Sequence, residues 1–272
     1  MESLSNGVVV ITGAADGIGR AFAFEAARRG MRLVLADKRA ERLEETASEL
    51  RALPAEVLAV VTDVTDPSSL EALADAAYER FSAVHVLINN AGVAYANNAW
   101  DTPLEEYERV IDVNLFGVIH GVRAFVPRML EQAAPAHVVN VASAAGLLTV
   151  PGLAAYCASK FAVVGFSEAL LLDLQERKTQ IGVTLVCPSW VKTGLVQREE
   201  EREVCELDSH ADAARTAMGR AVSEGISAEG VAASVFDAVL ADRFYVLTHE
   251  TTQAGFRVRS ADLLAGRAPR SF

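Results

Sequence analysis

The sequence predicts an α/β fold in which a doubly wound, Rossmann-type parallel sheet of about seven strands carries helices on both faces. Three observations lead to this prediction. Runs of β-branched residues alternate with segments of helical spacing along most of the 272 residues. A glycine-rich turn joins the first predicted strand to the first predicted helix. Aromatic residues are sparse, at 7%, while alanine, valine and leucine are abundant, which suits helix–sheet interfaces.

The expected elements follow in strict alternation. The strands are expected at Val8–Thr12, Arg32–Asp37, Val57–Val61, Val84–Asn89, His137–Val141, Val183–Cys187 and Phe244–Leu247. The helices are expected at about Ile18–Arg29, Ala40–Leu50, Pro67–Phe81, Pro103–Leu130, Leu153–Arg177 and Ala228–Leu240. No Pro/Gly-rich linker divides the chain, so residues 1–272 are expected to form a single domain. A variable substrate loop is expected at about 194–225, and a loosely held C-terminal tail from about 255.

Composition narrows the classes of partner. The formal net charge of −11 argues against a nucleic-acid partner, because phosphate binding needs a basic face. The three cysteines, Cys157, Cys187 and Cys205, form no CxxC pair, and the histidines show no metal-ligand spacing, so we expect no metal and a reducing, cytoplasmic location. The N-terminus has no signal-peptide pattern. The charge-free stretch 132–159 is interrupted by proline and glycine, so no membrane helix is expected.

The glycine-rich turn predicts a dinucleotide site. It reads TGAADGIG from residue 12 to residue 19, directly after a strand and at the start of a helix. Glycines allow a tight turn that a pyrophosphate can approach, and the helix N-terminus offers free N–H groups. Asp37 ends the second strand, 18 residues after Gly19, where a carboxylate can accept the hydroxyls of an adenosine ribose. The alternatives are an empty turn and a surface aspartate. The candidate cofactor-binding residues here are Thr12, Gly13, Asp16, Gly17, Ile18, Gly19 and Asp37.

Two further strand ends carry candidate cofactor contacts. Asp63 and Val64 follow the third strand and could hold the adenine edge, although an aspartate after a strand is also a common turn former. Asn89, Ala91 and Gly92 belong to an NNAG turn after the fourth strand. An asparagine can bond the loop backbone there, and a glycine lets a cofactor approach closely, but a plain turn is the competing interpretation.

A tyrosine and a lysine predict proton-transfer chemistry. Tyr156 and Lys160 are four residues apart on a predicted helix, so they share a face. A nearby ammonium group lowers the pKa of a tyrosine, which could then exchange a proton with an alcohol or carbonyl oxygen. Ser143 lies 13 residues before Tyr156, past the end of a strand, where it could bond the same oxygen. The alternatives are an exposed helical pair and an ordinary loop serine.

These motifs together resemble the single-domain branch of the short-chain dehydrogenase/reductase family. The resemblance covers about residues 8–193, in order, through TGxxxGxG, NNAG and YxxxK. It implies that Tyr156 is the general acid/base, Ser143 orients the substrate, and Lys160 binds the nicotinamide ribose and tunes Tyr156. It adds three residues that local reasoning does not find: Asn114, which would hold a water of a proton relay, and Pro188 and Thr193 at the nicotinamide. Ser189 stands where the family usually has glycine.

The resulting expectation is an oxidoreductase that transfers a hydride between a nicotinamide and an apolar secondary alcohol or ketone. The alternative is a non-catalytic dinucleotide-binding regulatory or scaffold protein on the same fold. NAD is expected over NADP, because Asp37 and Asp16 would repel a 2′-phosphate, whereas Lys38 and Arg39 are expected to point into water.

The loops that bind the substrate and one helix that could form a subunit interface are expected to be apolar. The loops around the predicted catalytic centre supply apolar side chains: Val93, Tyr95, Trp100, Leu147, Leu148, Val150, Leu153, Trp190, Leu195 and Val196. They predict a small apolar substrate. The helix from Leu153 to Leu174 is apolar nearly all round, which predicts a homodimer or homotetramer.

Overall fold

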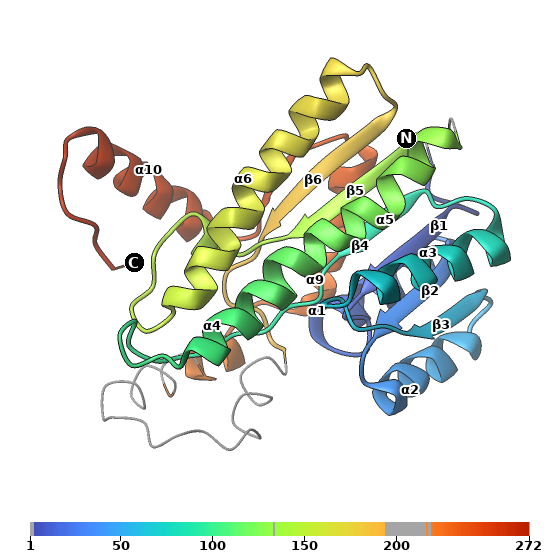
Figure 1. Ribbon diagram of the computed structural model, residues 1–272, viewed down its shortest axis with the longest axis horizontal. Helices are drawn as coiled ribbons and strands as arrows, with labels where there is room; N and C mark the ends of the chain where they lie inside the picture. The colour runs from blue at the N-terminus through green and yellow to red at the C-terminus, as the bar shows by residue number, and fades with distance from the viewer. Residues whose placement is uncertain (1–2, 133, 194–215, 217–218, 272) are drawn as a thin grey trace.

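The computed structural model describes residues 3–132, 134–193, 216 and 219–271 (Figure 1). Within them lies a parallel sheet of seven strands in the order β3-β2-β1-β4-β5-β6-β7. This confirms the predicted doubly wound sheet. The strands are β1 (Val8–Thr12), β2 (Arg32–Asp37), β3 (Val57–Val61), β4 (Val86–Asn89), β5 (Ala136–Val141), β6 (Ile181–Cys187) and β7 (Tyr245–Leu247).

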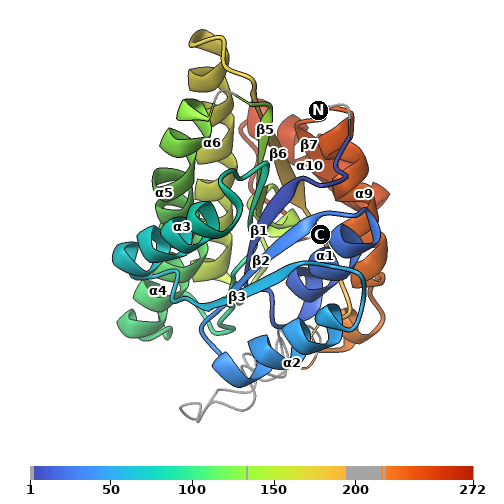
Figure 2. The same cartoon turned by 90° about the vertical axis from the view of Figure 1, so that its right-hand side faces the viewer.

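Helices cover both faces of the sheet (Figure 2). On one face lie α3 (Pro67–Phe81), α4 (Leu104–Ile111), α5 (Gly117–Glu131) and α6 (Ala154–Glu176). On the other lie α1 (Gly17–Arg28), α2 (Ala40–Arg51) and α9 (Ala228–Leu240). Because β1, β4 and β5 are buried on both faces, their sequences are mostly apolar rather than alternating, and the polar residues His137 and Asn140 of β5 are buried as well.

Capping residues determine where α1 and α3 begin. Asp16 caps α1 by accepting from the backbone N–H of Gly17, and Asp66 caps α3 by accepting from Ser68, with Pro67 in the first turn. The apolar faces of α1 and α9 then pack through Phe22 and Phe236, whose rings meet edge to face. Because all seven strands are parallel, their carboxyl ends lie at the same edge of the sheet, and the loops that follow them lie together there.

One long predicted helix is interrupted in the structure. The segment predicted as a helix from Pro103 to Leu130 consists of α4, a π-helical turn at Asp112–Phe116, and α5. The backbone N–H of Gly117 donates to the carbonyl of Asp112 across this turn. Such π-helical turns are frequent at functional sites, and this one contains Asn114.

The segment expected as a C-terminal tail from about residue 255 is largely helical. Residues Glu250–Leu264 form the helix α10, which extends away from the body of the protein (Figure 1). The segment after α10 folds back, because Arg267 and Arg270 both donate to the carboxylate of Asp262. The predicted substrate loop at 194–225 lies outside the described residues, except for 216 and 219–225.

Two helical stretches are long and apolar enough to cross a membrane by length and composition. They are Leu104–Glu131 and Ala154–Glu176, with mean hydropathies of 1.3 and 1.4. Both pack against the sheet and against neighbouring helices, and 56% and 39% of their most apolar windows are buried in the fold. Helices of this kind also occur in the cores of globular α/β proteins.

Candidate active site

One cavity of about 990 Å³ lies at the carboxyl ends of the strands. It reaches from Asp37 on β2 to Tyr156 on α6, so the predicted dinucleotide and proton-transfer residues share a single space. The sequence-predicted residues that line it are Gly13, Asp16, Gly17, Ile18, Asp37, Asp63, Val64, Ala91, Gly92, Ser143, Tyr156, Lys160, Pro188 and Thr193. Thr12, Gly19, Asn89 and Asn114 are absent from the lining.

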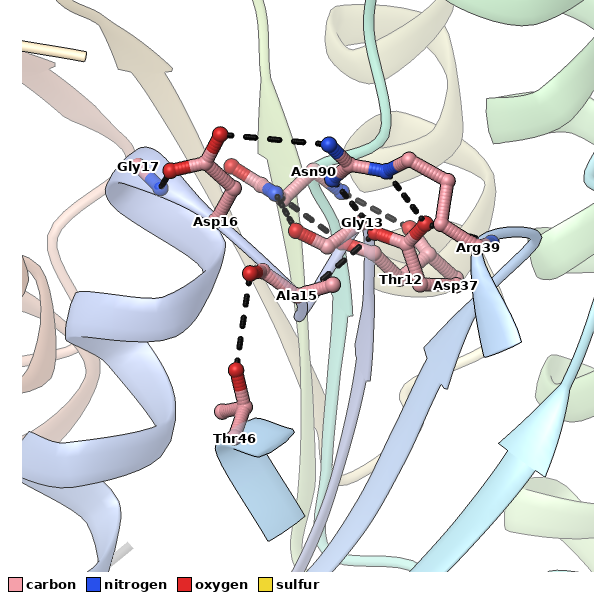
Figure 3. A network of polar contacts seen from close by, with 9 residues as sticks. All are labelled: Thr12, Gly13, Ala15, Asp16, Gly17, Asp37, Arg39, Thr46 and Asn90. Atoms are coloured by element: carbon pink, nitrogen blue, oxygen red, sulfur yellow. Dashed lines mark hydrogen bonds and ion pairs between the residues drawn. The ribbon is translucent and has the colours of Figure 1, made fainter. Parts of the chain in front are cut away.

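The turn after β1 is shaped by glycine and braced by a residue that the sequence did not single out. Gly13 and Gly17 have φ values of 65° and 55°, and a side chain on Gly19 would lie 2.0 Å from the carbonyl oxygen of Gly13. The side-chain amide of Asn90 donates to the carbonyls of Thr12 and Gly13, while the Thr12 hydroxyl accepts from the Asn90 backbone (Figure 3). Thr12 and Gly19 therefore shape the turn without lining the cavity, whereas Asn90 both braces the turn and lines the cavity.

Asp37, which was predicted to face the ribose, is already engaged by a neighbouring cation. The carboxylate accepts from the backbone of Ala15 and from the Arg39 guanidinium, at 3.1 Å to Nε and 3.2 Å to Nη2. The same guanidinium lies 3.9 Å from Asp16 (Figure 3). The expectation that Arg39 points into water is wrong, because two carboxylates within reach attract it.

Asp63 makes the contacts expected of a turn former, whereas Asn89 does not bond the loop backbone as expected. One oxygen of Asp63 accepts from the backbone and hydroxyl of Thr65, as in an aspartate-stabilised turn, while Asp63 still borders the cavity. Asn89 points into the fold, where its amide donates to Asn140 on β5. Asn140 in turn donates to Ser167 on α6.

Ser143, Tyr156 and Lys160 come together as expected. All three line the cavity, and the Lys160 ammonium lies 5.7 Å from the centre of the Tyr156 ring. Lys160 Nζ also donates to the carbonyl of Val141 at 2.9 Å. Burial lowers the pKa of Lys160 to about 8.

The pKa of Tyr156 moves opposite to the expected direction. Burial raises it, and the hydrogen bond from Ser143 offsets only part of that effect. Burial therefore dominates the pKa of Tyr156, and the expected lowering by Lys160 does not set its direction. The physical reason is that desolvation penalises both charged forms, the tyrosinate and the ammonium, in the same low-dielectric pocket.

Asn114 does not line the cavity, but its hydrogen bonds hold segments that do. Its side chain accepts from the backbone N–H of Val93 at 2.8 Å and donates to the carbonyl of Val93 at 2.9 Å. It also donates to the hydroxyl of Ser159 at 3.0 Å, and Ser159 donates to the carbonyl of Tyr156 at 2.7 Å. The π-helical turn, the loop after β4 and the first turn of α6 are thus tied together, and Ser159 is a link that local sequence reasoning missed.

The segment after β6 completes the wall beside Ser143. Ser189 is absent from the non-glycine residues with positive φ in the described chain, so this backbone path does not need a glycine. Thr193 packs near the glycine turn, where a side chain on Gly17 would lie 3.1 Å from it. Of the predicted apolar loop residues, the cavity lining includes Val93, Leu148, Val150, Leu153 and Trp190. Tyr95, Trp100 and Leu147 do not line it, and Leu195 and Val196 lie outside the described residues.

The donor set suits a nicotinamide dinucleotide. The N-terminus of α1 and the glycine turn can hold a pyrophosphate, and Asp37 at the end of β2 can meet a ribose. Tyr156 and Lys160 stand at the other end of the same cavity. A phosphate-binding turn therefore lies at one end of the cavity and a proton-transfer pair at the other, and a bound dinucleotide would reach from one end to the other.

Comparisons with known proteins agree with this geometry. The profile for short chain dehydrogenases matches residues 7–204. A CLA biosynthesis dehydrogenase/reductase from Lactiplantibacillus plantarum is 35% identical over 92% of this chain and 90% of its own. A 1-deoxy-11-beta-hydroxypentalenate dehydrogenase from Streptomyces exfoliatus is 37% identical over 96% of this chain and 89% of its own.

A solved structure is more similar still. The crystal structure of a short-chain dehydrogenase/reductase from Burkholderia phymatum in complex with NAD is 42% identical, with a TM-score of 0.97. The alignment covers 100% of this chain and 99% of that one. The chain therefore belongs to the short-chain dehydrogenase/reductase family of oxidoreductases.

Proposed function

We propose that the protein is an NAD-dependent alcohol dehydrogenase/carbonyl reductase that acts on an apolar secondary alcohol or ketone. The observation that carries this proposal is the shared cavity: Ser143, Tyr156 and Lys160 meet at one end of the space whose other end holds the glycine turn and Asp37. A bound nicotinamide would supply the hydride chemistry. The residues of the chain supply binding and proton transfer.

Tyr156 is the proposed proton-transfer group. Because burial raises its pKa, the neutral phenol is the resting form, and it can donate its proton to a carbonyl oxygen. In the oxidation direction Tyr156 must first lose its own proton, and the resulting tyrosinate then accepts the alcohol proton. Ser143, which lines the same cavity, would orient the same oxygen. Lys160 would hold the nicotinamide ribose, and its ammonium is positioned by donating to the Val141 carbonyl. Asn114 is the proposed support of a relay water, acting from the π-helical turn.

The preference for NAD rests on charge at the ribose end. Asp16 and Asp37 both line the cavity, and a 2′-phosphate there would meet both carboxylates. Arg39 neutralises part of that charge, so the discrimination is proposed to be moderate, on the order of 10- to 100-fold in kcat/KM. The similarity to a family member crystallised with NAD supports this direction.

The proposal that the substrate is apolar is based on the side chains that line the cavity beside Ser143. Leu148, Val150, Leu153 and Trp190 line that wall. The cation Arg109 also lines the cavity, but it is paired with Glu106 at 2.6 Å and donates to the carbonyl of Ala94. The named substrate of the Streptomyces relative, a hydroxylated pentalenate, is a hydroxyl-bearing compound, which supports an alcohol as substrate here.

We also propose a cytoplasmic homodimer or homotetramer with no nucleic-acid or membrane partner. Cys157 and Cys187 are buried free thiols, which suits a reducing compartment. The outer face of α6 exposes small and apolar residues, including Gly165, Ala169 and Leu172, and Leu172 is 64% exposed. A second copy of the chain would cover this face.

The experiment is a cofactor-reduction screen with NAD⁺ over apolar secondary alcohols, steroid alcohols and small charged hydroxy acids. The proposal expects the highest kcat/KM on an apolar alcohol. A small charged acid that is oxidised faster than every apolar alcohol would contradict the substrate class. Tight dinucleotide binding without turnover of any alcohol or ketone would instead favour the non-catalytic alternative.

A further inference from the structure

The first turn of α10 forms part of the cavity wall on the Ser143 side. His249, Thr251 and Thr252 line the cavity. The junction between β7 and α10 is bonded to the segment after β6, since the backbone N–H of Ser189 donates to the Thr248 hydroxyl at 3.4 Å. That segment is next to Ser143, whose hydroxyl donates to the carbonyl of Pro188 at 3.4 Å. The α10 turn therefore borders the end of the cavity where chemistry would occur, away from Asp37.

The α10 side chains that line the cavity are polar, unlike Leu148, Val150, Leu153 and Trp190 of the same cavity. α10 is a helix of 15 residues, and its N-cap residue His249 makes no side-chain capping hydrogen bond, so the helix presents an N-terminus without a side-chain cap. Thr252 lies in that first turn with only 2% of its surface exposed. Its hydroxyl has no hydrogen-bond partner in the structure. A buried hydroxyl without a partner is costly, and nothing in the described fold compensates it.

The charges around the turn favour a neutral ligand atom over an anion. Burial lowers the pKa of His249, which disfavours its charged form, although the hydrogen bond to the backbone of Trp190 opposes that shift; the ring is also bonded to the Thr248 hydroxyl. Glu250 is exposed in the first turn of α10, and its carboxylate opposes an anion at the helix N-terminus. The helix amides and the Thr252 hydroxyl are hydrogen-bond donors, so they match an acceptor oxygen that carries no full charge.

We propose that the first turn of α10, through the Thr252 hydroxyl and the uncapped amides, binds a second, uncharged oxygen of the substrate. The preferred substrates are then apolar secondary alcohols or ketones with a carbonyl or hydroxyl group distant from the reacting carbon. This inference rests on the proposed function, because it assigns the far end of the same substrate. It makes α10 a specificity element, and it gives Thr252 a role in substrate binding without a role in proton transfer.

The test uses three alcohols with one frame: a decalin-2-ol, the same decalinol with a ketone on the distal ring, and the same decalinol with a carboxylate there. The wild-type protein is expected to have the highest kcat/KM for the ketone-bearing alcohol. Thr252→Val should lower that value by about tenfold, the scale of one hydrogen bond, mainly through KM, and leave the plain decalinol within about twofold. Thr252→Ser keeps the hydroxyl and should restore most of the difference.

Calorimetry can measure binding of the corresponding diketone in the presence of NAD⁺, which tests the same site without turnover. The affinity should be weaker in Thr252→Val. An equal loss on all three alcohols, or no loss on any, would overturn the proposed site. A carboxylate-bearing alcohol preferred over the ketone would overturn its neutral character. If the wild-type protein oxidises none of the three but still binds the diketone more tightly than Thr252→Val does, the proposed function fails while the binding site stands.

Discussion

At the residue scale, the pair Asp37 and Arg39 decides how strongly the ribose end can reject a 2′-phosphate. Asp37 is 6% exposed, and its two oxygens face Arg39. Without Arg39, the carboxylates of Asp16 and Asp37 would meet a phosphate with only Lys38 and Arg42 on the cavity wall to compensate them. A like charge at this distance is worth on the order of 1–3 kcal/mol when poorly screened.

We therefore predict that Arg39→Gln lowers kcat/KM with NADP about tenfold more than kcat/KM with NAD, a difference of about 1.4 kcal/mol. Initial rates with both cofactors on one alcohol measure it. Arg51→Gln is a matched control, because Arg51 is exposed, pairs with Glu44 and is absent from the cavity lining. An unchanged or increased NADP rate in Arg39→Gln would show that Arg39 does not shield these carboxylates.

The sequence predicted the position of Asp37 correctly and the orientation of Arg39 wrongly. The position of Asp37 follows from the strand–turn–helix pattern, which is local. The orientation of Arg39 depends on Asp16, which lies 23 residues earlier and approaches it only after β1 and β2 pair. The raised pKa of Tyr156 was missed for the same reason, because burial is set by the whole fold and not by the spacing of Tyr156 and Lys160.

At the element scale, the first turn of α6 is held by a hydrogen-bonded link from Asn114 through Ser159 to the Tyr156 carbonyl. Asn114 and Ser159 are both fully buried. Loss of the Ser159 hydroxyl leaves the Asn114 amide with one partner fewer, and it frees the turn that carries Tyr156. Small displacements of a reacting group can lower rates by up to about 100-fold.

We predict that Ser159→Ala lowers kcat about tenfold while KM for the cofactor stays within about twofold, and that Ser159→Thr restores kcat. Steady-state kinetics over a range of pH should also show a shifted profile, since Tyr156 moves relative to Ser143. Ser167→Ala is the matched control: Ser167 is a buried serine on the same helix that bonds the Val163 carbonyl, far from the cavity lining. Equal kcat losses in both variants would indicate a general weakening of α6.

Most elements were predictable, and the exceptions have physical causes. Strands such as β1 and β2 have the predicted bounds, because continuous β-branched runs between turn residues are strong local signals. α10 lacks an apolar stripe, because Phe256, Val258 and Leu263 are distributed around it and remain partly exposed, so periodicity could not find it. In the π-helical turn each hydrogen bond spans one residue more than in an α-helix, and the amino-acid composition of the segment does not indicate this difference.

At the scale of the whole molecule, a buried histidine links stability to pH. His137 on β5 is 2% exposed and is hydrogen bonded to Thr184, and burial lowers its pKa to about 4, with Asp242 opposing the shift. An unfolded histidine titrates near 6.5. Above pH 7 both states are neutral, so His137 gives no pH dependence. As the pH falls from about 6.5 to about 4, only the unfolded state gains the proton, and folding loses stability.

The expected loss is on the order of 3 kcal/mol across that window, because each pKa unit corresponds to about 1.4 kcal/mol. Urea unfolding at several pH values measures it. His85 and His249 contribute in the same direction, since burial lowers their pKa values too, so the comparison is with His137→Gln. That variant should have a shallower slope between pH 6.5 and 4; an identical slope would remove His137 as the cause.

The proposed assembly is also a property of the whole molecule. We predict an oligomer at micromolar concentration, and that Leu172→Asp reduces its size, because a charge would be buried where α6 meets a second copy. Light scattering measures the mass. Leu53→Asp, a comparable exposed leucine at the end of α2, is the control and should not change the mass. A wild-type monomer would contradict the interface.

The central claim is that Tyr156 transfers the proton in a nicotinamide-dependent oxidation and reduction. The most direct measurement compares kcat of wild-type protein and Tyr156→Phe on the best apolar alcohol, with dinucleotide affinity measured on both. The account predicts a loss of at least about 100-fold in kcat, the usual scale for a general acid/base, with dinucleotide binding retained. A kcat within threefold of wild type in a folded, cofactor-binding Tyr156→Phe protein would contradict it.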